Sequence, residues 1–299
     1  MEGIRFVTQS VASKLLPKIA SFLDSIKFPE SIFALPFAYI GMVLAKEGLP
    51  TIHQFFWITI AMVSARTVGM VANRIIDRNI DAKNPRTSSR HLPSGILKVK
   101  DLAIPGAASF CIFMFSAWQL NTTALILAPV AAAYLIVYPY TKRVTWTANL
   151  LLGWALAIAP AAAWVGITGS LTWKPVLLSL SVALWAGSFD IIYHCQDVAF
   201  QKKERLHSVA EKFGIPKAFG MARLMDVGAL ISLISLGIWM ELEAPYYIGC
   251  AVSGIFITYK YFLVTPNDLS KMGMAFMRIN SFVSVSMLAG TLVSVFLWP

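Results

Sequence analysis

Long apolar runs without any charge dominate this chain and define its predicted helices. Residues 102–141, 144–173 and 279–299 contain no Asp, Glu, Lys or Arg. A helix that spans the hydrocarbon core of a membrane needs about 20 mostly apolar residues, and the chain supplies many such runs. The pattern predicts an all-α membrane protein with about nine transmembrane helices. The predicted spans lie near residues 29–46, 51–76, 100–119, 122–139, 146–166, 174–195, 217–240, 245–263 and 278–297.

Two polar connections between the predicted spans are much longer than the others. They cover residues 77–99 and 197–216 and carry most of the charge found in loops. Long polar loops in a compact membrane protein are commonly functional, although the alternative of plain solvated connectors stays open. We expect a single membrane domain over residues 28–299, with its function at these two connections.

Composition agrees with the membrane class, and the distribution of charge predicts the orientation. The chain is 57% hydrophobic and only 13% charged, whereas soluble domains are about one-quarter charged. The net charge of +10 needs no nucleic-acid partner, because Lys and Arg accumulate in the cytoplasmic loops of membrane proteins. With the N-terminus inside, only Lys46 and Lys174 are basic on the opposite face. We therefore expect the N-terminus and both long connections in the cytoplasm. The expected location is the inner membrane of a prokaryotic cell.

The segment before the first span has a different pattern. Residues 1–27 place Arg5, Lys14, Lys18 and Lys27 among apolar residues. Basic and apolar residues mixed in this way are typical of a helix that lies in the membrane interface, whereas a cleaved signal peptide needs an apolar core. We expect residues 1–27 to form a cytoplasmic interfacial segment.

The second predicted span ends in three oxygen-bearing side chains. Asn73, Asp77 and Asp81 recur at every fourth residue, so they lie along one stripe of a helix. Mg²⁺ prefers carboxylate and phosphate oxygens, and such a stripe at the membrane surface suits it. The alternative is a helix end whose acids pair with neighbouring bases such as Arg74 or Lys83. That alternative explains the acids less well, because two like charges four residues apart repel each other.

A second acidic group closes the sixth predicted span. Asp190 and Asp197 lie seven residues apart, on one face of a helix and two turns from each other. Asp190 directly follows a charge-free run, where an acid is expensive and indicates a functional site. Two such groups at the same end of two spans predict a site that holds two divalent ions around a diphosphate.

Basic residues that can bind a diphosphate follow or face these motifs. Arg86 and Arg90 lie just after the first motif and can donate forked hydrogen bonds to phosphate oxygens. Lys142 and the Tyr138 hydroxyl close the fourth span, although cytoplasmic loops carry bases for other reasons too. Arg66 lies inside a span and needs an anionic partner, either a motif aspartate or the carboxylate of an aromatic acid.

At these residues the sequence resembles the UbiA superfamily of intramembrane prenyltransferases over nearly its whole length. NRIIDRNIDAKNPRTSSRHLPSG, from Asn73 to Gly95, is similar to the first Asp-rich motif of the 4-hydroxybenzoate polyprenyltransferase branch. DIIYHCQD, from Asp190 to Asp197, is similar to the second, and YPYTKR and FMRIN also match familiar segments. The resemblance implies nine helices around a central cavity, capped by the two cytoplasmic loops, with the isoprenoid tail leaving toward lipid.

The resemblance also implies roles for the candidate residues. Asn73, Asp77 and Asp81 would hold one Mg²⁺, and Asp190 and Asp197 the other. The diphosphate of a polyprenyl donor would be bound by Arg86, Arg90 and Lys142, with Tyr138 nearby. Arg66 is similar to a family arginine placed near the acceptor.

Two positions depart from the family pattern. Gln201 stands where further acids are common after the second motif, so that Glu204 is a possible substitute ligand. Glu30 lies just before the first span, where relatives frequently carry His.

The residues indicate divalent ions around a diphosphate, and the resemblance implies a Mg²⁺-dependent polyprenyltransferase of quinone biosynthesis. Its expected substrates are a polyprenyl diphosphate and a small aromatic acid, with 4-hydroxybenzoate as the first expectation. A naphthoate or futalosine-derived precursor of menaquinone is the alternative acceptor. The alternative from another class is a secondary transporter, which predicts acids near mid-membrane on broken helices.

Overall fold

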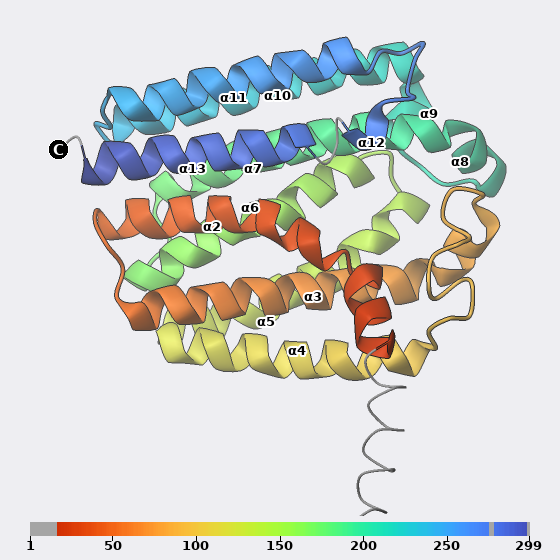
Figure 1. Ribbon diagram of the computed structural model, residues 1–299, viewed down its shortest axis with the longest axis horizontal. Helices are drawn as coiled ribbons and strands as arrows, with labels where there is room; N and C mark the ends of the chain where they lie inside the picture. Colours follow the sequence, from red (N-terminus) through yellow and green to blue (C-terminus); the bar gives the residue numbers. More distant parts are fainter. Residues whose placement is uncertain (1–16, 275–277, 298–299) are drawn as a thin grey trace, which may run out of the picture.

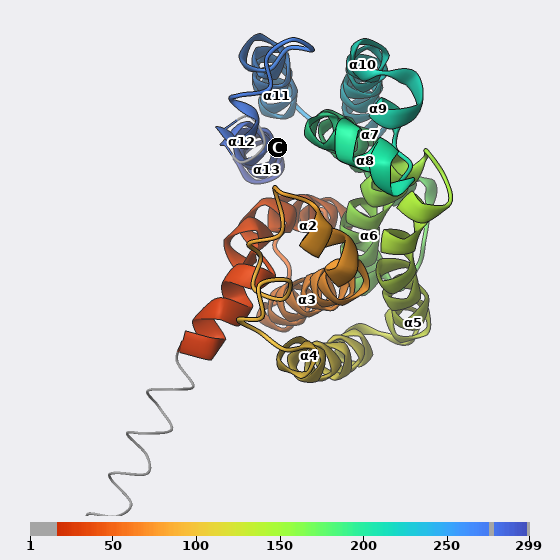
Figure 2. The ribbon, with the colours of Figure 1, turned by 90° about the vertical axis from the view of Figure 1, so that its right-hand side faces the viewer.

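The computed structural model describes residues 17–274 and 278–297, and within them long helices lie side by side as a bundle (Figure 1). Figure 2 views the same helices from one end. The long helices are α2 (Ser31–Lys46), α3 (Ile52–Lys83), α4 (Val99–Leu120), α5 (Thr122–Val137), α6 (Ala148–Thr168), α7 (Trp173–His194), α10 (Ile215–Trp239), α11 (Ala244–Leu263) and α13 (Asn280–Phe296). The short ones are η1 (Phe28–Glu30), η2 (Tyr138–Arg143), η3 (Cys195–Asp197), α8 (Val198–Glu204), α9 (Val209–Phe213) and α12 (Met272–Met274).

The predicted class, an all-α membrane protein, is confirmed. Among the described residues, 7 helices are long and apolar enough to cross a membrane. The predicted count of nine spans includes two more helices, α11 and the shorter apolar helix α13, which has 17 residues. The exact number of spans therefore stays a prediction.

Helix α3 continues seven residues past the predicted end of its span (83 minus 76). It begins after a capping box in which Thr51 and Gln54 exchange hydrogen bonds, and it continues to Lys83. Its 32 residues correspond to about 48 Å, which exceeds a hydrocarbon core of about 30 Å. The last turns, which carry Asp77 and Asp81, therefore extend beyond the apolar part of the bundle.

The two long polar connections meet at this end of the molecule. The first follows α3, and the second folds into η3, α8 and α9, which Figure 1 places at the same end as the loop between α3 and α4. Lys83 pairs with Glu204 at 2.6 Å, and the backbone N–H of His207 donates to the carbonyl of Lys142 at 2.7 Å. The second connection is thus fastened both to the end of α3 and to η2.

A close approach of α6 and α7 positions the second acidic motif. A Cβ atom on Gly153 of α6 would lie 2.2 Å from the carbonyl oxygen of Ala183 on α7. No side chain fits in that space, so only glycine permits this contact. The result is that α6 presents its own polar residue, Asn149, directly to α7.

The N-terminal segment lies partly outside the described residues, which begin at residue 17. Residues 17–25 are helical, and the helix crosses α3 in Figure 1. Ile26 is buried with Val71 and Leu102, and Arg74 donates from Nε to the carbonyl of Ser25 at 2.8 Å. The predicted interfacial position of residues 1–27 stays a prediction.

Candidate active site

Both acidic motifs line one polar cavity at the loop end of the bundle. The cavity has a volume of about 190 Å³ and receives side chains from α3, η2, α6, α7 and both connections. Five of its lining residues are the predicted metal ligands Asn73, Asp77, Asp81, Asp190 and Asp197. Asp77 and Asp190, 113 residues apart in the chain (190 minus 77), therefore face a common space.

The acids in this cavity are paired with bases from other segments. Asp77 accepts from the Lys142 ammonium and, at 3.1 Å, from Arg143. Arg90 donates to both oxygens of Asp81, at 2.9 Å and 2.8 Å. The alternative considered for the sequence, pairing with neighbours on the same helix, is thus replaced by pairs that join α3 to η2 and to the first connection.

The first connection also holds the second motif. Arg86 donates to Asp197 from Nε at 3.0 Å and from Nη2 at 2.5 Å, and Asn84 donates to the same carboxylate at 3.1 Å. Burial of the guanidinium lowers its pKa, but the hydrogen bond to Asp197 and the attraction of nearby Tyr193 outweigh burial and raise the pKa of Arg86. Arg86 therefore keeps its charge in this partly buried place.

Asp190 is held by a residue that sequence reasoning missed. Asn149 is buried and donates from Nδ2 to Asp190 Oδ2 at 2.7 Å, while its Oδ1 accepts from the backbone N–H of Val209 at 3.1 Å. His194 Nδ1 lies 3.1 Å from the same Asp190 oxygen. The available signal was the amide itself, because Asn149 is the one amide side chain in the charge-free run 144–173.

Three further residues at or beside the cavity were not predicted as part of the site. Arg74, which is 7% exposed, and Tyr193, whose hydroxyl accepts from Arg86 Nη1 at 2.7 Å, line the cavity, and Arg143 reaches it through its pair with Asp77. Arg74 had been considered only as a possible partner of the acids on its own helix, and Arg143 only as a cytoplasmic base. Glu204 pairs with Lys83 and so joins the second connection to α3, whereas Gln201 Oε1 accepts from Ser208 at 2.6 Å within the connection itself.

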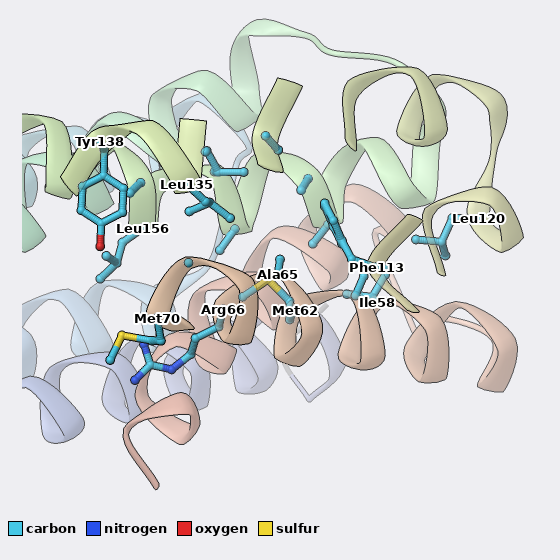
Figure 3. A pocket seen from close by; sticks show the side chains of 18 residues that line it. Ile58, Met62, Ala65, Arg66, Met70, Phe113, Leu120, Leu135, Tyr138 and Leu156 are labelled. Atoms are coloured by element: carbon cyan, nitrogen blue, oxygen red, sulfur yellow. The ribbon is translucent and has the colours of Figure 1, made fainter. Parts of the chain in front are cut away.

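An apolar cavity of about 120 Å³ adjoins the polar one, and Tyr138 lines both. In Figure 3, Arg66, Met70 and Tyr138 lie at one end of this cavity, and Phe113 and Leu120 lie at the other. A second apolar cavity of about 330 Å³ shares six lining residues with the first. These are Ala61, Phe113, Leu120, Ala131, Ile158 and Ala162. It reaches the outward-facing Val130, so apolar space runs from Tyr138 to the lipid-facing side of the bundle.

Arg66 has a partner that sequence reasoning did not name. Its Nη2 lies 3.7 Å from Glu30 Oε2 and donates to the carbonyl of Lys27 at 3.3 Å. The expected partners were a motif aspartate or a substrate carboxylate. In the structure the pairing carboxylate comes instead from η1, just before α2.

The polar cavity fits Mg²⁺ by the kind of ligand that it offers. In the described part of the chain, no three His, Cys, Asp or Glu side chains lie close enough together to hold a metal ion by themselves. Mg²⁺ is commonly bound by one or two carboxylates together with substrate phosphates and water, and carboxylate and amide oxygens from two sides line this space. The donor set suits a metal that arrives with a phosphate ligand.

Comparison with known proteins agrees with this architecture. The family model described as the UbiA prenyltransferase family matches residues 34–282. A 4-hydroxybenzoate octaprenyltransferase of Francisella tularensis subsp. novicida is 31% identical over 228 residues, which cover 75% of this chain and 78% of that protein. The protein of the same name from Vibrio cholerae serotype O1 is 28% identical over 261 residues, or 85% and 89% of the two chains.

Solved structures show the same fold. The apo structure of a UbiA homolog from Aeropyrum pernix K1 has a TM-score of 0.80 and 28% identity, and covers 89% of this chain and 98% of that one. A UbiA homolog from Archaeoglobus fulgidus bound to DMAPP and Mg²⁺ has a TM-score of 0.62 and 17% identity, with coverage of 89% and 99%. The chain belongs to the UbiA prenyltransferase family. It is a multi-pass membrane protein, and the predicted enzyme class, a polyprenyltransferase, is confirmed by its relatives.

Proposed function

We propose that this enzyme transfers a polyprenyl group from a polyprenyl diphosphate to a small aromatic acid, with 4-hydroxybenzoate as the acceptor, in ubiquinone biosynthesis. The observation that carries the proposal is the single polar cavity lined by both acidic motifs and joined through Tyr138 to an apolar cavity. A diphosphate head and an apolar tail need this combination of spaces. The names of the Francisella and Vibrio relatives support the acceptor.

The acids of the polar cavity are the proposed metal site. Asn73, Asp77 and Asp81 would hold one Mg²⁺ from α3, and Asp190 and Asp197 would hold another from the opposite wall. Archaeoglobus fulgidus homologs bound to DMAPP or GPP together with Mg²⁺ support the use of this metal. When bound, Mg²⁺ supplies positive charge that neutralises the leaving diphosphate.

The bases of the same cavity are the proposed diphosphate ligands. Arg86, Arg90 and Lys142 lie within reach of one space and carry hydrogen-bond donors suited to phosphate oxygens. Tyr138 stands at the entrance to the apolar cavity, where the first isoprene unit of a bound donor would lie. These residues position the allylic carbon between the diphosphate and the acceptor.

The reaction breaks the allylic carbon–oxygen bond, and its electron pair leaves with the diphosphate. The allylic cation accepts an electron pair from the ring carbon ortho to the phenolic hydroxyl, which forms the new carbon–carbon bond. The same ring carbon then loses its proton to water. Most of the side chains that line the apolar cavity are aliphatic, so few competing nucleophiles lie near the cation.

The acceptor belongs at the end of the apolar cavity that holds Arg66. A guanidinium presents paired donors that match a carboxylate. Arg66 and Tyr138 line opposite walls there, so an aromatic acid bound to Arg66 would lie beside the start of the polar cavity (Figure 3). We keep the naphthoate-type acceptors as members of the panel that tests this assignment.

The arrangement of the acids disfavours the transporter alternative. That alternative requires acids near mid-membrane on broken helices. Here α3 is continuous from Ile52 to Lys83, and its acids lie near one end beside basic connections. We propose that this end faces the cytoplasm of a prokaryotic cell and that residues 28–299 form one catalytic domain.

A membrane assay tests the proposal directly. Membranes that contain the protein are incubated with radiolabelled polyprenyl diphosphate, a panel of aromatic acids, and either Mg²⁺ or EDTA. We expect a prenylated product with 4-hydroxybenzoate that forms only with Mg²⁺. Uptake of label without any product would contradict the proposal and favour transport.

A further inference from the structure

Arg66 is bound to a carboxylate of the chain itself at the place proposed for the acceptor. Glu30 Oε2 lies 3.7 Å from Arg66 Nη2, and the two side chains are only 25% and 20% exposed. Glu30 is the last residue of η1 and directly precedes α2. The pair therefore lies between the N-terminal segment and the middle of α3.

Packing fixes the segment that presents Glu30. Ser25 and Lys27 both accept hydrogen bonds through their carbonyls from arginines of α3, at 2.8 Å and 3.3 Å. Ile26 between them is 3% exposed. Lys27 has a left-handed backbone with φ 52°, which costs about 1–2 kcal/mol for a residue other than glycine. The surrounding contacts offset this cost, so Glu30 is held against Arg66 by the fold.

This position creates a competition between two anions. An acceptor carboxylate that binds Arg66 shares one cation with Glu30, and two carboxylates within a few ångströms repel each other. Arg66 lines the apolar cavity and Glu30 lies beside it with 25% of its side chain exposed, so water screens the repulsion only in part. An acceptor without a carboxylate meets no such repulsion. Glu30 therefore acts selectively on acidic acceptors.

We propose that Glu30 is a specificity-determining residue that competes with the acceptor's carboxylate for Arg66 and so weakens the preference for acidic acceptors. The inference rests on the proposed function, in which Arg66 receives the acceptor. Glu30 does not line the polar cavity that holds the proposed diphosphate ligands. Its removal is expected to change acceptor recognition and to leave donor recognition as it is.

The test compares an acid with its neutral analogue. KM is measured for 4-hydroxybenzoate and for 4-hydroxybenzamide, which keeps the ring and the hydroxyl, in the parent enzyme and in Glu30→Gln. We expect Glu30→Gln to lower KM for the acid about tenfold, equivalent to about 1.4 kcal/mol, and to change KM for the amide by less than about twofold. The matched control is Glu47→Gln, an exposed glutamate at the end of α2, which is expected to change neither value.

A second variant and a second readout protect the test against misfolding. Glu30→Asp keeps the charge but withdraws it by one methylene, so KM for the acid is expected between those of the parent and Glu30→Gln. Thermal melting in detergent and KM for the donor report whether each variant is folded. An unchanged ratio of acid to amide KM in folded Glu30→Gln overturns the role of Glu30. Absence of any prenyl transfer by the parent enzyme overturns the proposed function itself, so the two failures are distinct.

Discussion

Arg86 donates hydrogen bonds to both carboxylate oxygens of Asp197, from Nε at 3.0 Å and from Nη2 at 2.5 Å. The same arrangement recurs in the cavity. Arg90 pairs with Asp81, and Lys142 pairs with Asp77. Each base proposed to bind the diphosphate is therefore paired with an acid proposed to bind Mg²⁺. When the metal and the diphosphate bind together, these ion pairs would separate. The acids would then bind the metal, and the bases would bind the phosphate oxygens.

The exchange predicts a specific defect when Arg86 is neutralised. A hydrogen bond to a charged group contributes about 1.5–3 kcal/mol, so Arg86→Gln is expected to raise KM for the polyprenyl diphosphate about tenfold or more. KM for the acceptor should stay within about twofold. The control is Lys203→Gln, which removes an exposed base of α8 in the second connection. An unchanged KM for the donor in Arg86→Gln would mean that Arg86 only stabilises the fold through its pair with Asp197.

Replacing the acids is expected to abolish turnover while the protein is still made and inserted into the membrane. Asp77→Ala or Asp190→Ala is expected to lower kcat by at least about a hundredfold, as loss of a charge-stabilising group commonly does. The amount of protein in the membrane fraction should stay close to the parent. Asp268→Ala, at an exposed turn, is the control. Activity within about threefold of the parent would exclude Asp77 or Asp190 as a metal ligand.

Replacing Asn149 is expected to raise the Mg²⁺ concentration that the enzyme needs. Asn149→Ala removes the amide that orients Asp190 and leaves the Val209 N–H without its partner. We expect the Mg²⁺ concentration for half-maximal activity to rise about tenfold and the unfolding free energy to fall by about 1–3 kcal/mol. Asn121→Ala is a matched control, because Asn121 also ties a helix end to α6, through the carbonyls of Val165 and Gly166. It is expected to lower stability without changing the Mg²⁺ requirement. Equal Mg²⁺ requirements in both variants would reduce Asn149 to a packing residue.

Local patterns in the sequence were sufficient to predict the helices and both motifs. Charge-free runs define spans by length, and the four-residue spacing of Asn73, Asp77 and Asp81 defines a face by helix geometry. The partners of these residues could not be predicted in the same way. Lys142 lies 65 residues after Asp77, and Glu30 lies 36 residues before Arg66 (66 minus 30). Such pairs depend on how helices pack against each other, which no local spacing records.

Replacing Arg66 is expected to affect KM for the acceptor and to leave KM for the donor nearly unchanged. Arg66→Ala is expected to raise KM for 4-hydroxybenzoate about tenfold or more, because the carboxylate loses a charged hydrogen-bond donor. KM for the donor should change by less than about twofold, since Arg66 lines the apolar cavity and not the polar one. Steady-state kinetics with each substrate varied in turn measures both values. An equal loss for both substrates would place Arg66 at the diphosphate.

The continuity of the two apolar cavities predicts that they bind the tail of the donor and so determine which tail lengths are accepted. Ala162 of α6 lines both cavities, so Ala162→Phe is expected to narrow the passage between them. Each buried CH₂ contributes about 0.8 kcal/mol, so a long tail that loses its place beyond the passage loses much binding energy. We expect kcat/KM for a long polyprenyl diphosphate to fall at least about tenfold relative to that for geranyl diphosphate. Ala108→Phe, on an exposed face of α4, is the control and should leave the ratio unchanged. A parallel loss with both donors in Ala162→Phe would show that the tail takes another route.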